Sequence, residues 1–360
     1  MKRLLSLLVA ILVVFTLSAC GTDTYDVAMI TDSGTIDDES FNQGTWEGIV
    51  EYCEANDISH KYYKPLEVSD DAYLGAIDLA VEGGAKVVVT PGFLFETAIY
   101  EAQNLYPEVK FILIDGVPHN PDYSDFATAD NTLSILFSEH ESGFLAGYAA
   151  VKDGYTKLGF TGGMAVPAVV KFGVGFIAGS YYAAQEEGVI LDFSNDTYLY
   201  LGDFAPSDNH KNTAASWYVK GTEVIFAAAG GAGSSIMSAA EENNGKSIGV
   251  DIDQSKQSET VITSALKQLG NAVMQGLEDW QNDKFVGGKA IFKGASNDGV
   301  ALPLETSKFN TFSQADYDAI YKKVAEGTVV VPASHEELVA FFAEEGITSA
   351  NYPTAEIVQP

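Results

Sequence analysis

The sequence predicts an α/β protein made of two doubly wound lobes, each built around a parallel sheet. Short runs rich in Val, Ile and Phe alternate with helical periods at ~30-residue spacing, which is typical of βαβ units. The runs are nearly continuous in apolar residues, as expected for strands that are buried on both faces of a sheet. They fall into two series, and 360 residues exceed the ~250–300 at which single cores stop growing, so we expect two lobes.

Each series should contain four strands with helices between them. The strands expected in the first series are VAMI (27–30), KYYK (61–64), KVVVT (86–90) and FILID (111–115). Those of the second series are KLGFT (157–161), TYLYL (197–201), EVIFAA (223–228) and SIGVD (247–251). Helical periods occupy residues 39–54, 71–83, 96–106, 136–152, 168–187, 209–220, 233–243 and 264–282. The C-terminal segment adds an amphipathic helix (315–327), a strand-like VVVP (329–332) and a last helix (335–346).

The two lobes need not be contiguous in sequence, and we expect the chain to cross between them three times. The stretch 120–135 is polar and rich in turn residues, a second crossing is expected just after Asp253, and a third near the Gly-rich turns at 285–300. We therefore assign residues 24–130 and 254–295 to an N-terminal lobe. Residues 131–253 and 296–360 are assigned to a C-terminal lobe.

The first 20 residues are typical of an export signal and are not expected to belong to the fold. Lys2 and Arg3 precede an apolar run (4–17), and the sequence LSAC follows, ending at Cys20. This order resembles the bacterial lipoprotein signal, in which residues 1–19 are removed and the cysteine is acylated, for example with palmitate. A single transmembrane anchor would require ~20 apolar residues, more than the run supplies. The resemblance implies a lipid-anchored protein on the extracytoplasmic face of the cell membrane.

Composition and charge exclude several classes of function. The 50 Asp plus Glu against 20 Lys plus Arg give a net charge of −30, which becomes −32 when both basic residues of the signal are removed. Such acidity repels phosphate, which excludes nucleic acid as a partner and disfavours nucleotides as ligands. A hydrophobic content of 46% excludes a disordered chain, and a mean hydropathy of +0.04 excludes a polytopic membrane protein. If Cys20 carries lipid, Cys53 has no disulfide partner, and its helical context predicts a buried structural thiol.

Polar and aromatic residues gather where the expected strands end. Ligands of open α/β sheets bind outside the carboxyl ends of the strands. The residues that follow these runs give nine candidates for a ligand site: Asp32, Phe41, Asn42, Asp115, Phe204, Gly230, Asp251, Asp253 and Lys267. No Ser-His-Asp motif, HExxH motif or Cys/His cluster accompanies them, so the sequence predicts no catalytic residues, no metal and no cofactor.

The chemistry of these residues suits a nucleoside. Carboxylates accept hydrogen bonds from ribose hydroxyls, and a lysine beside them adds a donor and neutralises buried charge. Phe41 and Phe204 come from opposite lobes and can sandwich a planar heterocycle, while Asp32 and Asn42 can bond to its edge. A glycine at position 230 lets the backbone approach the ligand closely.

Four motifs resemble those of one known family. DSGTIDDESFNQGTWEG (32–48), the GDF turn (202–204), AAAGGAGSS (227–235) and IGVDIDQ followed by SALK (248–254 and 264–267) occur in the right order. They are similar to the basic membrane protein family of ABC-transporter substrate-binding lipoproteins, which includes purine nucleoside receptors. The resemblance spans nearly the whole mature chain. It implies a type I periplasmic-binding fold with two lobes and a three-segment hinge, a nucleoside held between the lobes, a membrane permease as partner, and no reaction.

The resemblance also implies roles for individual residues. Its base-binding Asp corresponds to Asp32, its stacking residues to Phe41 and Phe204, its ribose-side glycine to Gly230 or Gly231, and its ribose Lys to Lys267. The ribose Asp corresponds to Asp251, with Asp253 as the rival. Glu39 stands near a turn where the family pattern often has a basic residue, which leaves the base preference open. The segment 166–179 also resembles the family, without an assigned contact.

Several alternatives stay open. Asp37 or Asp38 can simply cap the following helix, and Phe41 can belong to the core. A receptor of the same fold for a sugar or another small molecule would not need Asp32 at a base edge. A calcium-dependent nucleoside hydrolase would use the DSGTIDD acids, but Lys267 at the same edge would repel a cation. A structural surface lipoprotein would not need polar clusters in both lobes, so we expect a binding protein that closes by a hinge around its ligand.

Overall fold

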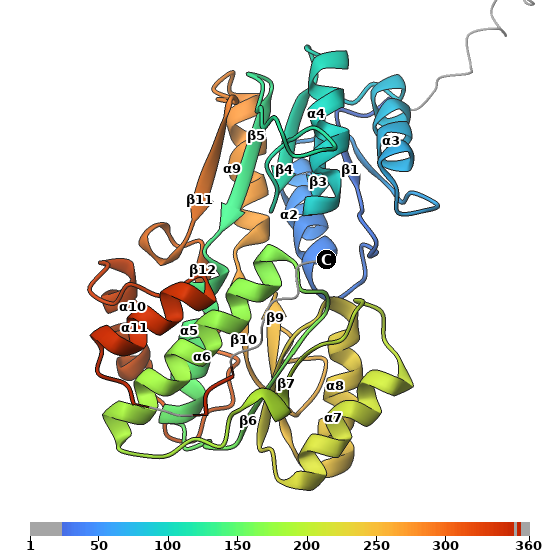
Figure 1. The fold of residues 1–360 in the computed structure, drawn as a ribbon. Helices are drawn as coiled ribbons and strands as arrows, with labels where there is room; N and C mark the ends of the chain where they lie inside the picture. Colours follow the sequence, from blue (N-terminus) through green and yellow to red (C-terminus); the bar gives the residue numbers. More distant parts are fainter. Residues whose placement is uncertain (1–23, 349–350, 354–360) are drawn as a thin grey trace, which may run out of the picture.

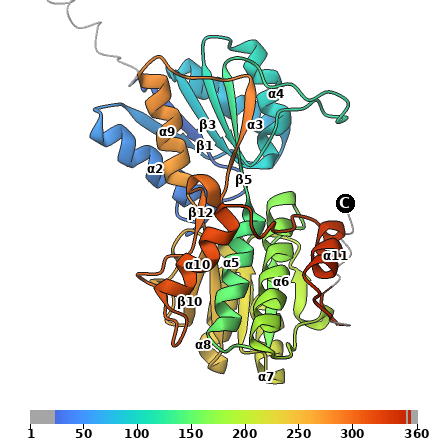
Figure 2. The same cartoon turned by 90° about the vertical axis from the view of Figure 1, so that its left-hand side faces the viewer.

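The computed structural model describes residues 24–348 and 351–353, and these residues form two lobes that lie one above the other (Figure 1). The predicted signal segment, with Lys2, Arg3 and Cys20, lies outside the described residues. Within the described part of the chain, none of the helices combines the length and the apolar character needed to cross a membrane. Each lobe contains a six-stranded sheet that is covered by helices (Figures 1 and 2).

The sheet of the first lobe has the strand order β11-β5-β4-β3-β1-β2, with parallel pairing throughout. Its strands are β1 (Val27–Ile30), β2 (His60–Tyr63), β3 (Val87–Pro91), β4 (Lys110–Ile114), β5 (Thr132–Phe137) and β11 (Lys289–Lys293). Its helices are α2 (Phe41–Ala55), α3 (Asp70–Glu82), α4 (Glu96–Leu105) and α9 (Leu269–Gln281). Figure 2 shows α2 and α9 on one face and α3 and α4 on the other. Side chains alternate along each strand, so Val27 and Met29 join one core while Ala28 and Ile30 join the other.

The sheet of the second lobe has the strand order β12-β10-β9-β8-β6-β7, and only the edge strand β12 pairs antiparallel. Its strands are β6 (Leu158–Gly162), β7 (Tyr198–Tyr200), β8 (Val224–Ala228), β9 (Lys246–Asp251), β10 (Val261–Lys267) and β12 (Val300–Ala301). Its helices are α5 (Glu139–Lys152), α6 (Pro167–Glu187), α7 (Asp208–Lys220), α8 (Gly233–Asn243), α10 (Gln314–Ala325) and α11 (His335–Glu344). Helices α7 and α8 share a core with β8, whereas α5 and α6 belong to the main core, with α10 and α11 packed outside them.

Helices α5 and α6 approach each other unusually closely because glycines line their contact. A β-carbon at Gly175 would lie 1.9 Å from the carbonyl oxygen of His140, and one at Gly143 would lie 2.2 Å from that of Phe172. Both distances are far below van der Waals contact, so only glycine fits at these positions. This packing explains Gly175 and Gly179 of the segment 166–179, whereas Gly173 lies against Tyr198 of β7.

The structure corrects two of the three predicted crossings. The boundaries at 130/131 and 253/254 are wrong because β5 belongs to the first sheet and β10 to the second, so the chain crosses near residues 138 and 268. Each of these two strands is joined to the next helix by a single residue, so no turn marks the boundary. Each strand also contains Thr and Ser residues, which interrupt the apolar run by which the other strands were recognised. The helical periods expected at 136–152 and 264–282 therefore included strand residues. The third crossing lies between β11 and β12, within the expected stretch 285–300.

Two further expectations about strands were wrong. The VVVP segment (329–332) forms no strand in the described structure; it is irregular chain in which Val329 and Val331 are buried and Val330 is exposed. The strand near KYYK is not buried on both faces, because β2 lies at the edge of its sheet and is partly exposed. Tyr and Lys at such an edge keep polar atoms in water, so its sequence differs from that of the inner strands.

Candidate functional site

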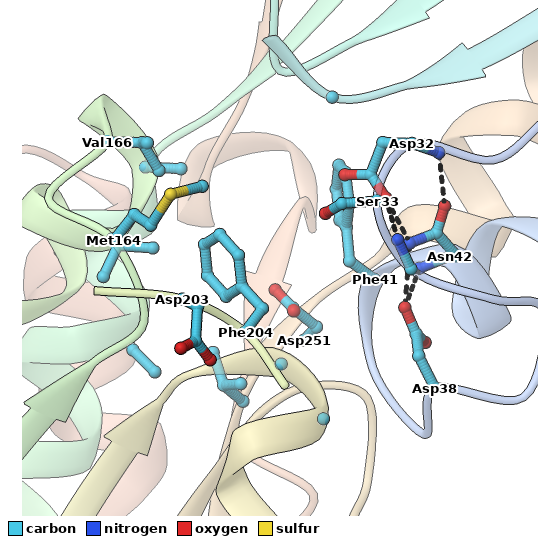
Figure 3. Close-up of a pocket in the computed structure, with 18 of the residues that line it drawn as sticks. Asp32, Ser33, Asp38, Phe41, Asn42, Met164, Val166, Asp203, Phe204 and Asp251 are labelled. Atoms are coloured by element: carbon cyan, nitrogen blue, oxygen red, sulfur yellow. Dashed lines mark hydrogen bonds between the residues drawn. The ribbon is translucent and has the colours of Figure 1, made fainter. Parts of the chain in front are cut away.

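A cavity of about 880 Å³ opens between the lobes, at the carboxyl ends of the strands of both sheets (Figure 3). Its volume lies in the range of small-molecule sites, ~300–1,000 Å³. Eight of the nine predicted site residues line it: Asp32, Phe41, Asn42, Asp115, Phe204, Gly230, Asp251 and Lys267. Asp253 does not line this cavity; its carboxylate accepts hydrogen bonds from Ser255 N–H and the Thr306 hydroxyl outside it.

Two phenylalanines enter the cavity from opposite lobes. Phe41 is the first residue of α2, and Phe204 lies in the loop between β7 and α7 (Figure 3). The carbonyl oxygen of Phe204 accepts a hydrogen bond from Ala232 N–H at 2.8 Å, which fixes the loop. Its ring lies against Gly163, where a β-carbon would be 2.2 Å from two ring atoms. The position of Phe204 therefore depends on a glycine that follows β6.

Asp32 is held in place by a chain of hydrogen bonds that sequence analysis did not anticipate. Nδ2 of Asn42 donates to Asp32 Oδ1 at 2.9 Å and to Asp38 Oδ2 at 2.8 Å, and Oδ1 of Asn42 accepts from Asp32 N–H at 3.3 Å. Gly34 N–H also donates to Asp32 Oδ1 at 2.8 Å. Both amide hydrogens of Asn42 are thus used within the protein. Asn42 orients Asp32 and, contrary to expectation, has no amide hydrogen left for a ligand.

Asp38 acts as a cap of α2, as the sequence suggested for Asp37 or Asp38. Its oxygens accept hydrogen bonds from the backbone N–H groups of Asn42 and Gln43, both at 3.1 Å. These are two of the amide groups that a helix start leaves without partners. Asp32 differs from Asp38 because it does not cap the helix. Its Oδ1 accepts hydrogen bonds from Gly34 and Asn42, and its side chain faces the cavity (Figure 3). Burial raises the pKa of Asp32, and the hydrogen bonds that it accepts from Gly34 and Asn42 partly offset this rise.

Asp115 and Asp251 occupy equivalent positions in the two lobes. Asp115 directly follows β4 and Asp251 ends β9, and their φ angles are +56° and +65°. Aspartate tolerates this left-handed backbone better than most residues do. The change of backbone direction at each aspartate ends the strand at the edge of the cavity. Ser40 of the first lobe donates its hydroxyl hydrogen to Asp251 Oδ2 at 2.6 Å, a direct contact between the lobes. Burial raises the pKa of Asp251, and the nearby Lys267 opposes this effect.

Lys267 lies at the centre of the polar cluster. It is the last residue of β10, not a helix residue as expected, and its side chain is almost fully buried. Its ammonium is paired with Asp115 and lies 3.6 Å from Oε1 of Glu139 and 4.6 Å from the centre of the Phe41 ring. Burial alone would lower the pKa of Lys267, but the carboxylates of Asp115, Glu139 and Asp251 raise it above its ordinary value. The ammonium is therefore charged and available as a donor.

The sequence did not identify several side chains of the site. Met164 and Val166 line the cavity from the loop after β6 (Figure 3). Phe172 lines it from α6. The rule that found the other residues, reading the chain just beyond each strand, would also have found Met164. Glu139 was missed because the strand before it was not recognised.

The acids of the DSGTIDD segment do not form a calcium cage. Among the described residues, no three His, Cys, Asp or Glu side chains come together in a way that could hold a metal ion. Both oxygens of Asp38 and one oxygen of Asp32 already accept N–H bonds. Such oxygens are poorly placed for a hard cation, which needs six to eight oxygen ligands. The cavity instead combines apolar walls with a few fixed donors and acceptors.

Comparison with known proteins agrees with this architecture. The family described as ABC transporter substrate-binding protein, PnrA-like (Bmp), matches residues 25–335. The chain is 30% identical to the ABC transporter nucleoside-binding protein BmpA of Lactococcus lactis subsp. cremoris over 332 residues, which are 85% of this chain and 88% of the relative. It is also 30% identical to basic membrane protein A1 of Borrelia garinii subsp. bavariensis over 357 residues, which are 96% and 100% of the two chains.

Solved structures with the same fold include solute-binding proteins of ABC transporters. One from Aeropyrum pernix K1 superposes with a TM-score of 0.74 at 23% identity, covering 89% of this chain and 97% of that one. One from Conexibacter woesei DSM 14684 has a TM-score of 0.69 at 21% identity, covering 86% and 99%. These likenesses confirm the predicted fold class, a periplasmic-binding fold with two doubly wound lobes.

Proposed function

This chain belongs to the PnrA-like family of ABC transporter substrate-binding proteins, as its motifs indicated, and from this premise we propose that it binds a nucleoside, of the purine class, between its lobes. The family implies a small-molecule ligand and a transporter permease as partner. The proposal adds the chemical class of the ligand and the roles of the residues that contact it.

The observation that carries the proposal is the polar cluster beside two aromatic side chains that enter the cavity from opposite lobes. Among the described residues, Oδ1 of Asp115 is buried without a hydrogen-bond partner, although Asp115 lines the cavity. A buried acceptor in this state favours a ligand that donates a hydrogen to it. Ribose hydroxyls supply such donors to Asp115 and Asp251, and the Lys267 ammonium donates in return. We assign the ribose to this cluster, with Asp251 rather than Asp253 as the ribose ligand.

The base is assigned to the space between Phe41 and Phe204. Stacking of a base on an aromatic side chain contributes ~1–3 kcal/mol. Oδ1 of Asp32 accepts hydrogen bonds from Gly34 and Asn42, which leaves Oδ2 to accept from N–H groups at the base edge. Purines have a larger face than pyrimidines, which favours them in a site with two aromatic walls.

The proposed mechanism is closure of the lobes around the ligand. Site residues come from both lobes, so a bound nucleoside adds contacts that exist only when the lobes are together, and this shifts the equilibrium toward the closed form. No chemical step is assigned, since the family is one of substrate-binding proteins. We also propose that Cys20 carries lipid and holds the protein at the extracytoplasmic face of the membrane.

Isothermal titration of the purified protein tests this function. Guanosine, inosine, adenosine and uridine are the ligands, and ribose and glucose are the controls. We expect binding of purine nucleosides at one site per chain and no binding of either sugar. Binding of a sugar but of no nucleoside would contradict the proposal. Release of free base on prolonged incubation, with or without calcium, would show that the protein is an enzyme.

A further inference from the structure

Glu139 is buried beside the cavity without lining it. It is the first residue of α5, directly after the chain crosses from the first lobe to the second, and only 2% of its side chain is exposed. Its Oε1 lies 3.6 Å from the ammonium of Lys267, and its Oε2 lies 3.3 Å from the ammonium of Lys171 on α6. Glu139 thus connects the lysine of the cavity to the helix that forms part of the cavity wall.

The charges alternate along a line that runs through the hinge. Asp115 at the end of β4 pairs with Lys267, Lys267 approaches Glu139, and Glu139 approaches Lys171. Asp115 belongs to the first lobe, whereas Lys267 and Glu139 flank two of the crossings. With Asp115 alone, the Lys267 ammonium would be drawn toward the first lobe. Glu139 and Asp251 attract it from other elements, so the ammonium rests among three carboxylates.

Glu139 is costly to bury, and its own contacts do not make it a strong stabiliser of the fold. Its position in the first turn of α5 favours a negative charge. Among the described residues, however, Oε2 has no hydrogen-bond partner and only the ion pair with the partly exposed Lys171. A buried ion pair with incomplete hydrogen bonding contributes little net stability compared with apolar residues. A role in the site accounts for Glu139 better than a role in stability.

We propose that Glu139 is a positioning residue for ligand binding: it holds the Lys267 ammonium at the edge of the cavity, against the face of Phe41. This inference rests on the proposed function, because it concerns a ligand that contacts Lys267 and Phe41. The ammonium lies 4.6 Å from the centre of the Phe41 ring and 5.1 Å from that of Phe137, so a shift of the ammonium also changes the packing of Phe41. Loss of Glu139 therefore disturbs the polar contact and the stacking contact together.

The test is guanosine affinity, measured by isothermal titration, for Glu139→Gln, Lys267→Met and the double variant. Glu141→Gln is the matched control, because Glu141 lies in the same first turn and accepts a hydrogen bond from Ala295 N–H at 2.6 Å but does not contact Lys267. We expect Glu139→Gln to weaken binding about tenfold. Glu141→Gln should stay within about twofold of the wild type. In the Lys267→Met background, Glu139→Gln should have almost no further effect, since its partner is absent.

Two results would overturn the inference. The first is wild-type affinity in folded Glu139→Gln. The second is the same tenfold loss with and without Lys267, which would show that Glu139 acts independently of it. If Glu139→Gln does not fold, Glu139→Asp tests the same point, because the shorter side chain withdraws the carboxylate, and affinity must fall while Glu141→Asp leaves it unchanged. A wild type that binds no nucleoside would instead contradict the proposed function itself, and the positioning role with it.

Discussion

Replacing Gly163 by Ala should weaken ligand binding mainly by displacing the ring of Phe204, with a lesser contact at 3.1 Å to the carbonyl oxygen of Asp203. The new β-carbon would lie 2.2 Å from Cδ1 and Cε1 of the ring, whereas ordinary contact begins at 3.4 Å, so the ring must move by about 1.2 Å. Gly163 and Phe204 lie at the end of β6 and in the loop after β7, and the displaced ring loses its place against the base. Loss of one stacking contact costs ~1–3 kcal/mol, so the affinity should fall roughly 5- to 150-fold.

The assay is isothermal titration with guanosine, with the unfolding midpoint in urea measured on ligand-free protein. Phe204 lies in a loop and is only partly buried, so the free energy of unfolding should fall by less than about 1 kcal/mol. Gly233→Ala is the control, because a β-carbon at Gly233, at the start of α8, would meet only the β-carbon of Ala227 at 4.0 Å. Unchanged affinity in Gly163→Ala would refute the role of Phe204, and an equal loss in Gly233→Ala would refute the specificity of the effect.

Three further predictions concern the ribose ligand, the helix contact and the thiol. Asp251→Ala should abolish the rise in melting temperature that nucleoside causes, and Asp253→Ala should keep it, because of these two residues only Asp251 lines the cavity. Loss of the rise in both variants would contradict the assignment of Asp251 as the ribose ligand. Gly175→Ala should lower the free energy of unfolding in urea by about 3 kcal/mol, because the new β-carbon would lie 1.9 Å from the carbonyl oxygen of His140. An unchanged urea midpoint would show that α5 and α6 can separate enough to accommodate the β-carbon. Burial raises the pKa of the Cys53 thiol to about 12, so iodoacetamide at pH 8 should modify it only after unfolding, and rapid modification of the native protein would contradict this.

The chemistry of the site was accessible from the sequence because parallel sheets impose a simple rule. Residues that directly follow buried strands meet at one edge, so Asp32, Asp115 and Asp251 could be brought together without knowing the strand order. Phe204 could be added because it follows a strand in a polar turn. The rule says nothing of hydrogen-bond partners, which is why Asn42 was expected to contact the ligand and is instead bonded to Asp32 and Asp38.

Two of the three crossings could not be located from the sequence for a physical reason. A boundary is visible when turn residues interrupt the pattern, but β5 and β10 each continue into a helix through one residue, Ser138 and Gln268. The helical period therefore seemed to begin within the strands. This hid the place of Lys267 at a strand end and gave no reason to examine Glu139. Partners far apart in sequence, such as Ser40 and Asp251, become visible only when both lobes are placed together.

Native mass spectrometry of the freshly purified protein shows directly whether a nucleoside occupies the cavity between the lobes. Denaturation of the same sample releases any bound molecule for identification by its mass and fragmentation. We predict one bound molecule per chain that fragments into a base and a pentose. A hexose, an amine or a nucleotide in its place, released from protein that then fails to bind guanosine, would contradict it.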